Sequence, residues 1–272
     1  MRNKEPVMRH GPASTNVDGM KMIVADHVMT IRFDREHKRN SITYDMYHGL
    51  TASLKQAALD DQIRCILLAS SGSIFSGGHD VSGFAQGMDR AYDEKPSFAF
   101  MECLSTFPKP VVAALNGDAI GIGATMLFHC DFIYAVPGCR LVFPFARMGL
   151  VPEFASSFFL PRLVGHRKAM ALLLIDGSCS AEEAAELGII NEIVPNERLE
   201  SCVAATLARI VALSPEAVTL TKSLLMAENK EAVRIAIRQE AKGFHHLLQS
   251  PFVRERLAAI KQKISGFGHH TP

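Results

Sequence analysis

The most constraining feature of this 272-residue sequence is a repeated order of segments: a short apolar run, a glycine-containing turn, then helical spacing. Residues 65–69 and Val111–Leu115 are continuous apolar runs, which is typical of strands buried on both faces. Apolar residues recur at helical spacing in Tyr44–Leu59 and in residues 98–106. Strands that alternate with helices predict an α/β protein with mostly parallel sheets.

The rest of the chain divides into a strand-containing body and a helical C-terminal third. We expect two strands within residues 22–33 around a turn at Asp26-His27, further strands at residues 132–135 and 141–143, and a helix over residues 121–128. After about residue 160 the strand signals become weak. Helical character marks residues 168–174, 181–187, 199–213, 215–228, 231–248 and 251–264.

Composition excludes several classes of protein. The formal net charge is +1, without the basic excess of a nucleic-acid-binding protein. Apolar runs are too short to span a bilayer. Residues 1–19 lack the apolar region of a secretory signal and read as a loose tail. Six scattered cysteines without a C-x-x-C pair favour reduced thiols. We expect a soluble protein in a cytoplasmic compartment, with no nucleic-acid or membrane partner.

Two glycine turns each follow an expected buried strand. In residues 74–80 (IFSGGHD), Gly77 and Gly78 allow a tight turn that points backbone amides at a ligand, although an ordinary strand-to-helix turn is the more frequent meaning of such a segment. Gly121 and Gly123 open an expected helix, whose free N–H groups suit an oxyanion. A dinucleotide-binding turn is disfavoured, because Met126 stands where the third glycine of G-x-G-x-x-G belongs.

A third segment carries one carboxylate among apolar residues. Glu153 lies near Val151, Phe154 and Phe158, and apolar surroundings raise the pKa of a carboxyl toward the value of a useful general base. The alternative is a surface glutamate that starts a helix after Pro152. No G-x-S-x-G nucleophile motif occurs, and the histidine pairs lack the spacing of metal ligands, so no metal is expected.

In their order along the chain, these segments resemble the enoyl-CoA hydratase/isomerase (crotonase) superfamily. The resemblance covers roughly residues 20–265 and rests on REHKRNS (residues 35–41), FSGGHD, KPVVAALNGDAIGIGATMLFHCDFIYA and AEEAAELGIINEIVP (residues 181–195). It implies a crotonase spiral of ββα units over residues 20–200. It also implies a helical trimerisation region over residues 201–272, in a homotrimer or a hexamer built as a dimer of trimers.

The resemblance further implies an acyl-CoA substrate whose thioester oxygen lies between the backbone amides of His79 and Ile122. Two preorganised donors suit an enolate-like oxyanion. Coenzyme A enters as part of the substrate thioester, and no tightly bound cofactor is expected. The positions that the resemblance assigns to substrate or coenzyme A binding are His37, Lys38, Arg39, Gly77, Gly78, Asp80, Gly121, Thr125, Phe145, Lys261 and Lys263.

The sequence departs from the hydratases of this superfamily at two positions. Where hydratases resemble one another in having two water-activating glutamates, this chain has Thr125 and Phe145, and neither can act as a carboxylate base. Residues 152–157 (PEFASS) instead resemble the S-P-E-x-x-S-S stretch of peroxisomal-type Δ3,Δ2-enoyl-CoA isomerases, where the glutamate is the base. We therefore expect Glu153 to be the catalytic residue of such an isomerase. The alternatives are hydration or another crotonase reaction, and a catalytically silent CoA-thioester binding protein.

Overall fold

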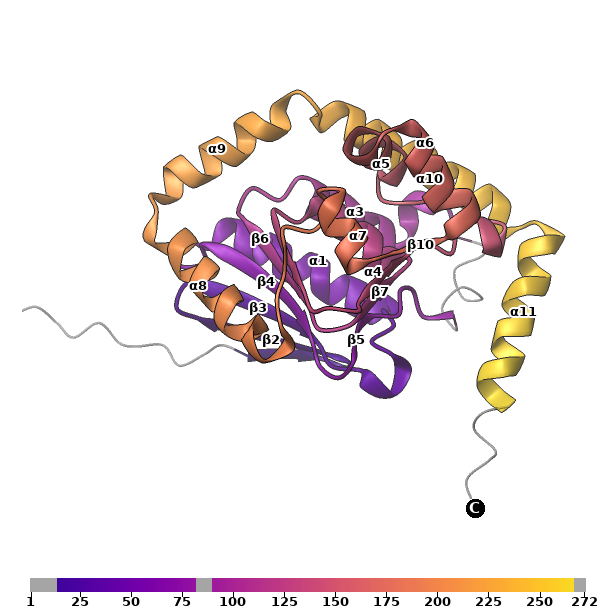
Figure 1. The fold of residues 1–272 in the computed structure, drawn as a ribbon, viewed down its shortest axis with the longest axis horizontal. Helices are drawn as coiled ribbons and strands as arrows, with labels where there is room; N and C mark the ends of the chain where they lie inside the picture. Colours follow the sequence, from indigo (N-terminus) through magenta and orange to yellow (C-terminus); the bar gives the residue numbers. More distant parts are fainter. Residues whose placement is uncertain (1–13, 82–89, 267–272) are drawn as a thin grey trace, which may run out of the picture.

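A computed structural model describes the backbone of residues 14–81 and 90–266, with side chains from residue 17 to residue 259 outside the same gap. The described strands form two sheets, and helices cover them (Figure 1). The larger sheet has seven strands in the order β1-β2-β3-β4-β6-β8-β11. Their bounds are Ser14–Val17, Met20–Ala25, Val28–Phe33, Cys65–Ser70, Val111–Leu115, Phe132–Ala135 and Glu192–Ile193. The first three strands are antiparallel and the later ones pair in parallel.

The smaller sheet has the order β10-β9-β7-β5, with bounds Ser178–Ser180, Arg140–Val142, Asp118–Ile120 and Ile74–Ser76. Strands β5, β7 and β9 each follow a strand of the larger sheet after a short connection, and a helix follows each pair. The chain thus repeats a ββα unit. The first strand of each unit joins the larger sheet, the second joins the smaller sheet, and a helix then covers the two layers. The glycine turns after β5 and β7 consequently lie at one edge of the smaller sheet.

Ten described α-helices surround the sheets. They are α1 (Tyr44–Leu59), α3 (Pro96–Ser105), α4 (Ile122–Thr125), α5 (Ser156–Val164), α6 (His166–Met170), α7 (Ala181–Glu186), α8 (Leu199–Ala212), α9 (Pro215–Ala227), α10 (Lys230–Leu248) and α11 (Pro251–Gly266). Short 3₁₀ segments are η1 (Glu36–Lys38), η2 (Tyr92–Glu94), η3 (Met126–His129), η4 (Ala146–Met148) and η6 (Asn196–Arg198), and η5 (Ala171–Asp176) is π-helical. Helix α10 packs back against α3 and α5 of the body (Figure 1).

The predicted strand pair, the helix at Tyr44–Leu59 and the strands at Val111–Leu115 and Phe132–Ala135 are all confirmed. Two predictions need correction, and three strands were missed. Residues 14–17, placed in the loose tail, form β1 against β2, and residues 1–13 of that tail lie outside the described residues. The helix expected over residues 121–128 is the four-residue α4 followed by η3. Strands β5, β7 and β10 were not predicted, because three residues are too few to show an alternating pattern.

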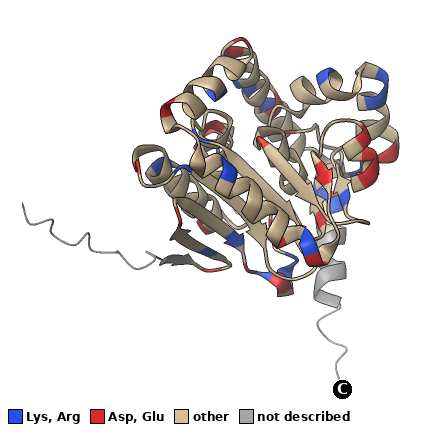
Figure 2. Ribbon diagram, turned by 60° about the vertical axis from the view of Figure 1, so that its left-hand side comes forward, with Lys and Arg blue, Asp and Glu red and all other residues tan. Residues whose placement is uncertain are grey.

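The core fills the space between the two sheets and helices α1 and α3. The fully buried aromatic side chains are Phe33, Tyr47, Phe75, Phe100, Phe107, Phe143 and Phe154. Burial of each such side chain stabilises the folded state by roughly 1.5–3 kcal/mol. The glycine turns are therefore supported by a well-packed core. Charges of both signs are spread along the visible helices (Figure 2). Among the described helices none alone is long and apolar enough to cross a membrane; Asn196–Ala212 and Pro215–Ala227 reach that length and composition only as a pair bent by 104°.

Candidate active site

The two predicted glycine turns meet through their backbones. A Cβ atom on Gly78 would lie 2.6 Å from the Ile120 carbonyl oxygen, and one on Gly123 would lie 2.7 Å from the Ser76 Cβ. Gly78 also has φ +83°, a left-handed conformation that side chains disfavour. Only glycine permits this approach, which brings His79 and Ile122 to neighbouring positions.

The local hydrogen bonds orient the amides of His79 and Ile122. Ile42 forms a parallel bridge with His79: its N–H donates to the Gly78 carbonyl at 2.7 Å, and its carbonyl accepts the Asp80 N–H at 2.9 Å. In a parallel bridge the middle residue turns its own N–H away from the partner, so the His79 N–H points away from Ile42. The Ile122 N–H is in the first turn of α4, where a helix has no internal acceptor.

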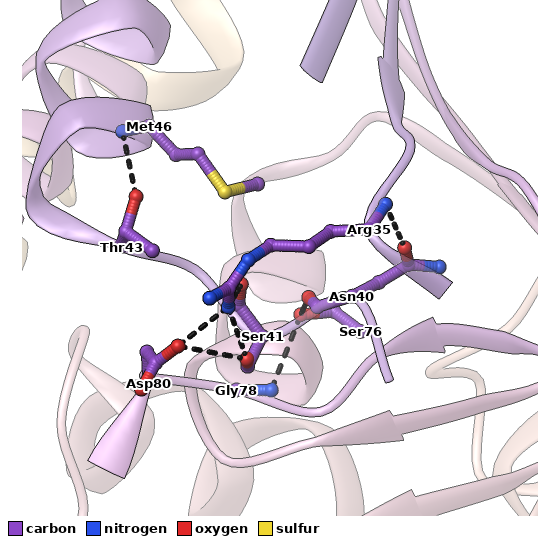
Figure 3. Close-up of polar contacts among 8 residues, drawn as sticks. All are labelled: Arg35, Asn40, Ser41, Thr43, Met46, Ser76, Gly78 and Asp80. Carbon is purple, nitrogen blue, oxygen red and sulfur yellow. Dashed lines mark hydrogen bonds and ion pairs between the residues drawn. The ribbon is translucent and has the colours of Figure 1, made fainter. Parts of the chain in front are cut away.

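A buried polar cluster fixes the loop before His79 (Figure 3). Arg35 donates to the Asp80 carboxylate at 2.5 Å and to the Ser41 hydroxyl at 2.9 Å. The side chain of Asn40, fully buried, accepts the Arg35 N–H at 2.8 Å and donates to the Ser71 and Ile74 carbonyls at 2.8 and 2.7 Å. Asp80 is therefore the ion partner of Arg35.

Glu153 occupies an unusual turn that enters α5. The next two residues, Phe154 and Ala155, have φ of +60° and +56°, a left-handed conformation that is uncommon outside glycine. The polar groups of the turn are nevertheless paired: His129 Nε2 donates to the Phe154 carbonyl at 2.9 Å, and Ser156 donates its N–H and its hydroxyl to the Glu153 carbonyl. Tertiary contacts thus hold a strained turn that carries Glu153.

The Glu153 side chain lines a cavity of about 60 Å³. Among the described residues, no hydrogen bond or ion pair to its carboxyl group is found. Burial, followed by the nearby negative charge of Glu240, raises the pKa of Glu153 from 4.5 to about 8. The group is therefore a stronger base than an ordinary glutamate, and no partner within the described part of the chain competes for its proton.

The cavity wall is largely apolar and aromatic. Its other members are Tyr44, His79, Tyr92, Lys95, Ser97, Phe98, Met101, Ile237, Ala241, Phe244, His245 and Leu248. His79 stacks on Tyr47, and its Nδ1 lies 3.1 Å from the Tyr47 hydroxyl. Burial lowers the pKa of His79 to about 4, so its ring is neutral at pH 7. Burial also lowers the pKa of Lys95.

The structure brings only part of the predicted site to this cavity. Glu153 and His79 both line it. His37, Lys38 and Arg39 are exposed on and after η1, and the Arg39 carbonyl accepts the Gly77 N–H at 2.7 Å, so this basic loop adjoins the first glycine turn. Gly121, with φ +56°, precedes α4.

Two further predicted positions, Thr125 and Phe145, do not line the cavity. Thr125 is fully buried, and its hydroxyl has no partner within the described part of the chain. Phe145 is buried in the core, and neither residue is among the cavity-lining side chains. The side chains of Lys261 and Lys263 lie outside those that the structure describes.

Sequence reasoning missed the contribution of α10. The region from residue 201 onward was expected to serve trimer formation, yet Ile237, Phe244 and His245 of α10 line the cavity. A second carboxylate, Glu240, lies on the same helix behind Glu153. The amphipathic spacing of α10 identified a buried face but not what that face covers.

Two glycine turns in backbone contact, the first of which shares a cavity with one carboxylate, on a ββα spiral, define a protein of the crotonase class. The sequence profile named enoyl-CoA hydratase/isomerase matches residues 24–265. The chain belongs to this family, which confirms the crotonase fold expected from the motifs.

Several known proteins are similar to this chain. Enoyl-CoA delta isomerase 2 of Rattus norvegicus is 32% identical over 219 residues, which cover 78% of this chain and 56% of the relative. The chain therefore spans little more than half of that relative's length. The 1,2-epoxyphenylacetyl-CoA isomerase of Escherichia coli K12 is 34% identical over 199 residues, 69% of this chain and 74% of the relative. Among solved structures, Pseudomonas aeruginosa OdaA has a TM-score of 0.85 at 36% identity and covers 90% of this chain and 99% of its own.

Proposed function

We propose that the chain is a Δ3,Δ2-enoyl-CoA isomerase in which Glu153 transfers the proton and the amides of His79 and Ile122 hold the thioester oxygen. The observation that carries this proposal is the state of Glu153: one carboxyl group without a partner among the described residues, raised in pKa, on an apolar cavity wall. The similarity to enoyl-CoA delta isomerase 2 supports the same reaction.

The proposed reaction needs one base and no external reagent. Ionised Glu153 takes a proton from C2 of a 3-enoyl-CoA, and the electron pair moves into a dienolate whose charge rests on the thioester oxygen. The same carboxyl then returns the proton to C4, so that the double bond lies between C2 and C3 and no atom is gained or lost. Two amide donors stabilise the dienolate, and loss of one such donor typically costs about 2.7–4 kcal/mol.

The surroundings of Glu153 favour proton shuttling over hydration. Hydration by two carboxylates would need a second base near the cavity, and the corresponding positions hold the buried Thr125 and Phe145. An apolar wall also limits water, which would otherwise protonate the dienolate. Glu240, the carboxylate whose charge acts on Glu153, already accepts hydrogen bonds from two backbone amides.

The raised pKa of Glu153 predicts the pH dependence of the reaction. Only the ionised form can accept a proton, and at pH 7 about a tenth of a group with a pKa of about 8 is ionised. We therefore expect kcat/KM to rise with pH and to level off above about pH 8.

The test is a spectroscopic assay with 3-enoyl-CoA and with 2-enoyl-CoA substrates. Conversion of 3-enoyl to 2-enoyl thioester by the wild type would support the proposal. The rate should fall at least about 100-fold in Glu153→Gln and stay unchanged in the exposed control Glu186→Gln. Comparable hydration of 2-enoyl-CoA would instead assign a hydratase. Intact binding of acyl-CoA without turnover would assign a silent binding protein.

We also propose that the chain forms a homotrimer or a hexamer in the cytoplasm. Helix α9 supports the assembly, since Leu220, Leu224 and Leu225 are 58%, 69% and 77% exposed. Large exposed apolar patches mark interaction surfaces. Light scattering coupled to size exclusion measures the mass, and a monomer at micromolar concentration would refute the assembly.

A further inference from the structure

The N-terminus of α5 is capped by a residue from a distant helix. Glu240 of α10 is 7% exposed, and its Oε2 and Oε1 atoms accept the N–H groups of Ala155 and Ser157 at 2.6 and 2.8 Å. Ala155, the N-cap residue, has no side chain that could cap the helix. The carboxylate of Glu240 therefore supplies the acceptor that the local sequence lacks, at the positive end of the helix.

This contact controls the turn that presents Glu153. Phe154 and Ala155 are left-handed, which is unfavourable for residues with a Cβ and persists only where the surroundings enforce it. Glu240 holds the amide side of the turn through Ala155, and His129 holds its carbonyl side through Phe154. The ring of His129 also stacks on Phe154 with centroids 4.1 Å apart. Without the carboxylate, the buried amide of Ala155 and the amide of Ser157 would lose their acceptor.

The same carboxylate acts on Glu153 through its charge. Burial raises the pKa of Glu240 to about 7, and the two amides together with the Ser157 side chain oppose that rise. The two amides favour the ionised form of Glu240, whereas the carboxyl group of Glu153 accepts no hydrogen bond from the described residues, so we expect Glu240 to ionise first as the pH increases. Its negative charge then makes removal of the proton from Glu153 harder. The other titratable groups around Glu153 are Tyr44 and Tyr47 of α1, His79 after β5, Tyr92 of η2, Lys95 before α3, and His245 of α10.

We propose that Glu240 is a positioning residue, which holds the left-handed turn that presents Glu153 to the cavity and places a negative charge behind it. The catalytic part of this inference rests on the proposed isomerase function. The structural part does not, because it concerns two carboxyl groups of the free protein. The two parts therefore require separate measurements.

The first measurement is a titration of Glu153 without substrate. In protein labelled with ¹³C at glutamate carboxyl groups, the Glu153 signal is the one absent from Glu153→Gln. In Glu240→Gln we expect its apparent pKa to fall by about one unit or more, because a neighbouring negative charge is removed. The control Glu231→Gln makes the same change on the exposed side of α10, beside Arg234, and should leave the signal unchanged.

The second measurement is turnover of a 3-enoyl-CoA. In Glu240→Gln we expect kcat to fall about tenfold or more with KM within about twofold, and the rise of rate with pH to move to lower pH together with the carbon signal. Glu240→Asp retains the charge one methylene further back and should recover part of both values. It also carries the test if Glu240→Gln does not fold.

The outcomes separate the two ideas. A wild-type protein without isomerase activity refutes the proposed function, while the carbon titration still decides the coupling of the carboxyl groups. If Glu240→Gln folds, an unchanged titration of Glu153 overturns the proposal. If Glu240→Gln does not fold, a wild-type pH profile and a wild-type kcat in Glu240→Asp overturn it. A variant that only loses thermal stability assigns Glu240 a structural role, which also overturns it.

Discussion

The sharpest prediction concerns the stability, rather than the activity, of Glu153→Gln. The folded chain raises the pKa of Glu153 from 4.5 to about 8, which corresponds to about 5 kcal/mol against its ionised form. Between these two pH values the unfolded chain has lost the proton and the folded chain still binds it. Because the folded state binds more protons, the free energy of unfolding falls as the pH rises through this window. Glutamine has no proton to lose.

We therefore expect Glu153→Gln to be as stable as the wild type at about pH 5 and more stable at about pH 9. Glu153 is partly exposed to the cavity, which screens the charge, so the expected gain at high pH is at least ~2 kcal/mol rather than the full value. Urea unfolding at both pH values measures it, with the exposed Glu186→Gln as control. If the free energies of unfolding of Glu153→Gln and the wild type differ by the same amount at both pH values, the fold does not disfavour the ionised form of Glu153, and the reasoning is refuted. A variant that is less stable at both pH values would show that Glu153 stabilises the fold.

Three further substitutions test the scaffold of the site. Gly78→Ala would press a methyl group against the Ile120 carbonyl oxygen, so we expect kcat to fall more than tenfold with about 1–3 kcal/mol lost in urea unfolding. Arg35→Met would remove the guanidinium group that pairs with the buried Asp80 carboxylate, and we expect the free energy of unfolding to fall by about 3–5 kcal/mol; unchanged unfolding would contradict the pairing in Figure 3. Lys109→Met would remove the ammonium group that donates to three backbone carbonyls, so we expect the free energy of unfolding to fall by about 3 kcal/mol or more. A melting temperature within a degree of wild type would contradict this.

Helices and strands that are long enough to show a repeated spacing of apolar residues, or a complete apolar run, could be predicted from the sequence. Helix Tyr44–Leu59 shows repeated apolar spacing and a Thr43 hydroxyl that caps it, and its predicted bounds are the observed ones. Strand Val111–Leu115 is a complete apolar run bounded by Pro110 and Asn116. Strands β5 and β7 have three residues each, and their pairing through Ile74 and Asp118 depends on contacts between distant segments. Of the second sheet, local patterns therefore predicted only the strand at residues 141–143, which is β9 (Arg140–Val142).

The candidate site, too, could be predicted only in part from the sequence. Glycines at positions 78 and 121 could be assigned to tight turns, since both have positive φ and only glycine accepts that conformation readily. The turn at Phe154-Ala155 is also left-handed but contains no glycine, so the sequence offered no sign of it. Its conformation is imposed by Glu240, 85 residues away from Ala155, and by His129.

A signal for Glu240 was nevertheless present in α10. The buried positions Val233 and Ile237 are four residues apart, and Glu240 follows three residues later, on the face where helical spacing favours an apolar side chain. A carboxylate on a buried face is costly unless donors meet it, so its presence indicates a partner on the surface that the helix covers. That partner is the turn at Glu153. The charged residue that breaks the apolar pattern of α10 thus points to the site, although the pattern alone could not reveal where on the body the helix docks.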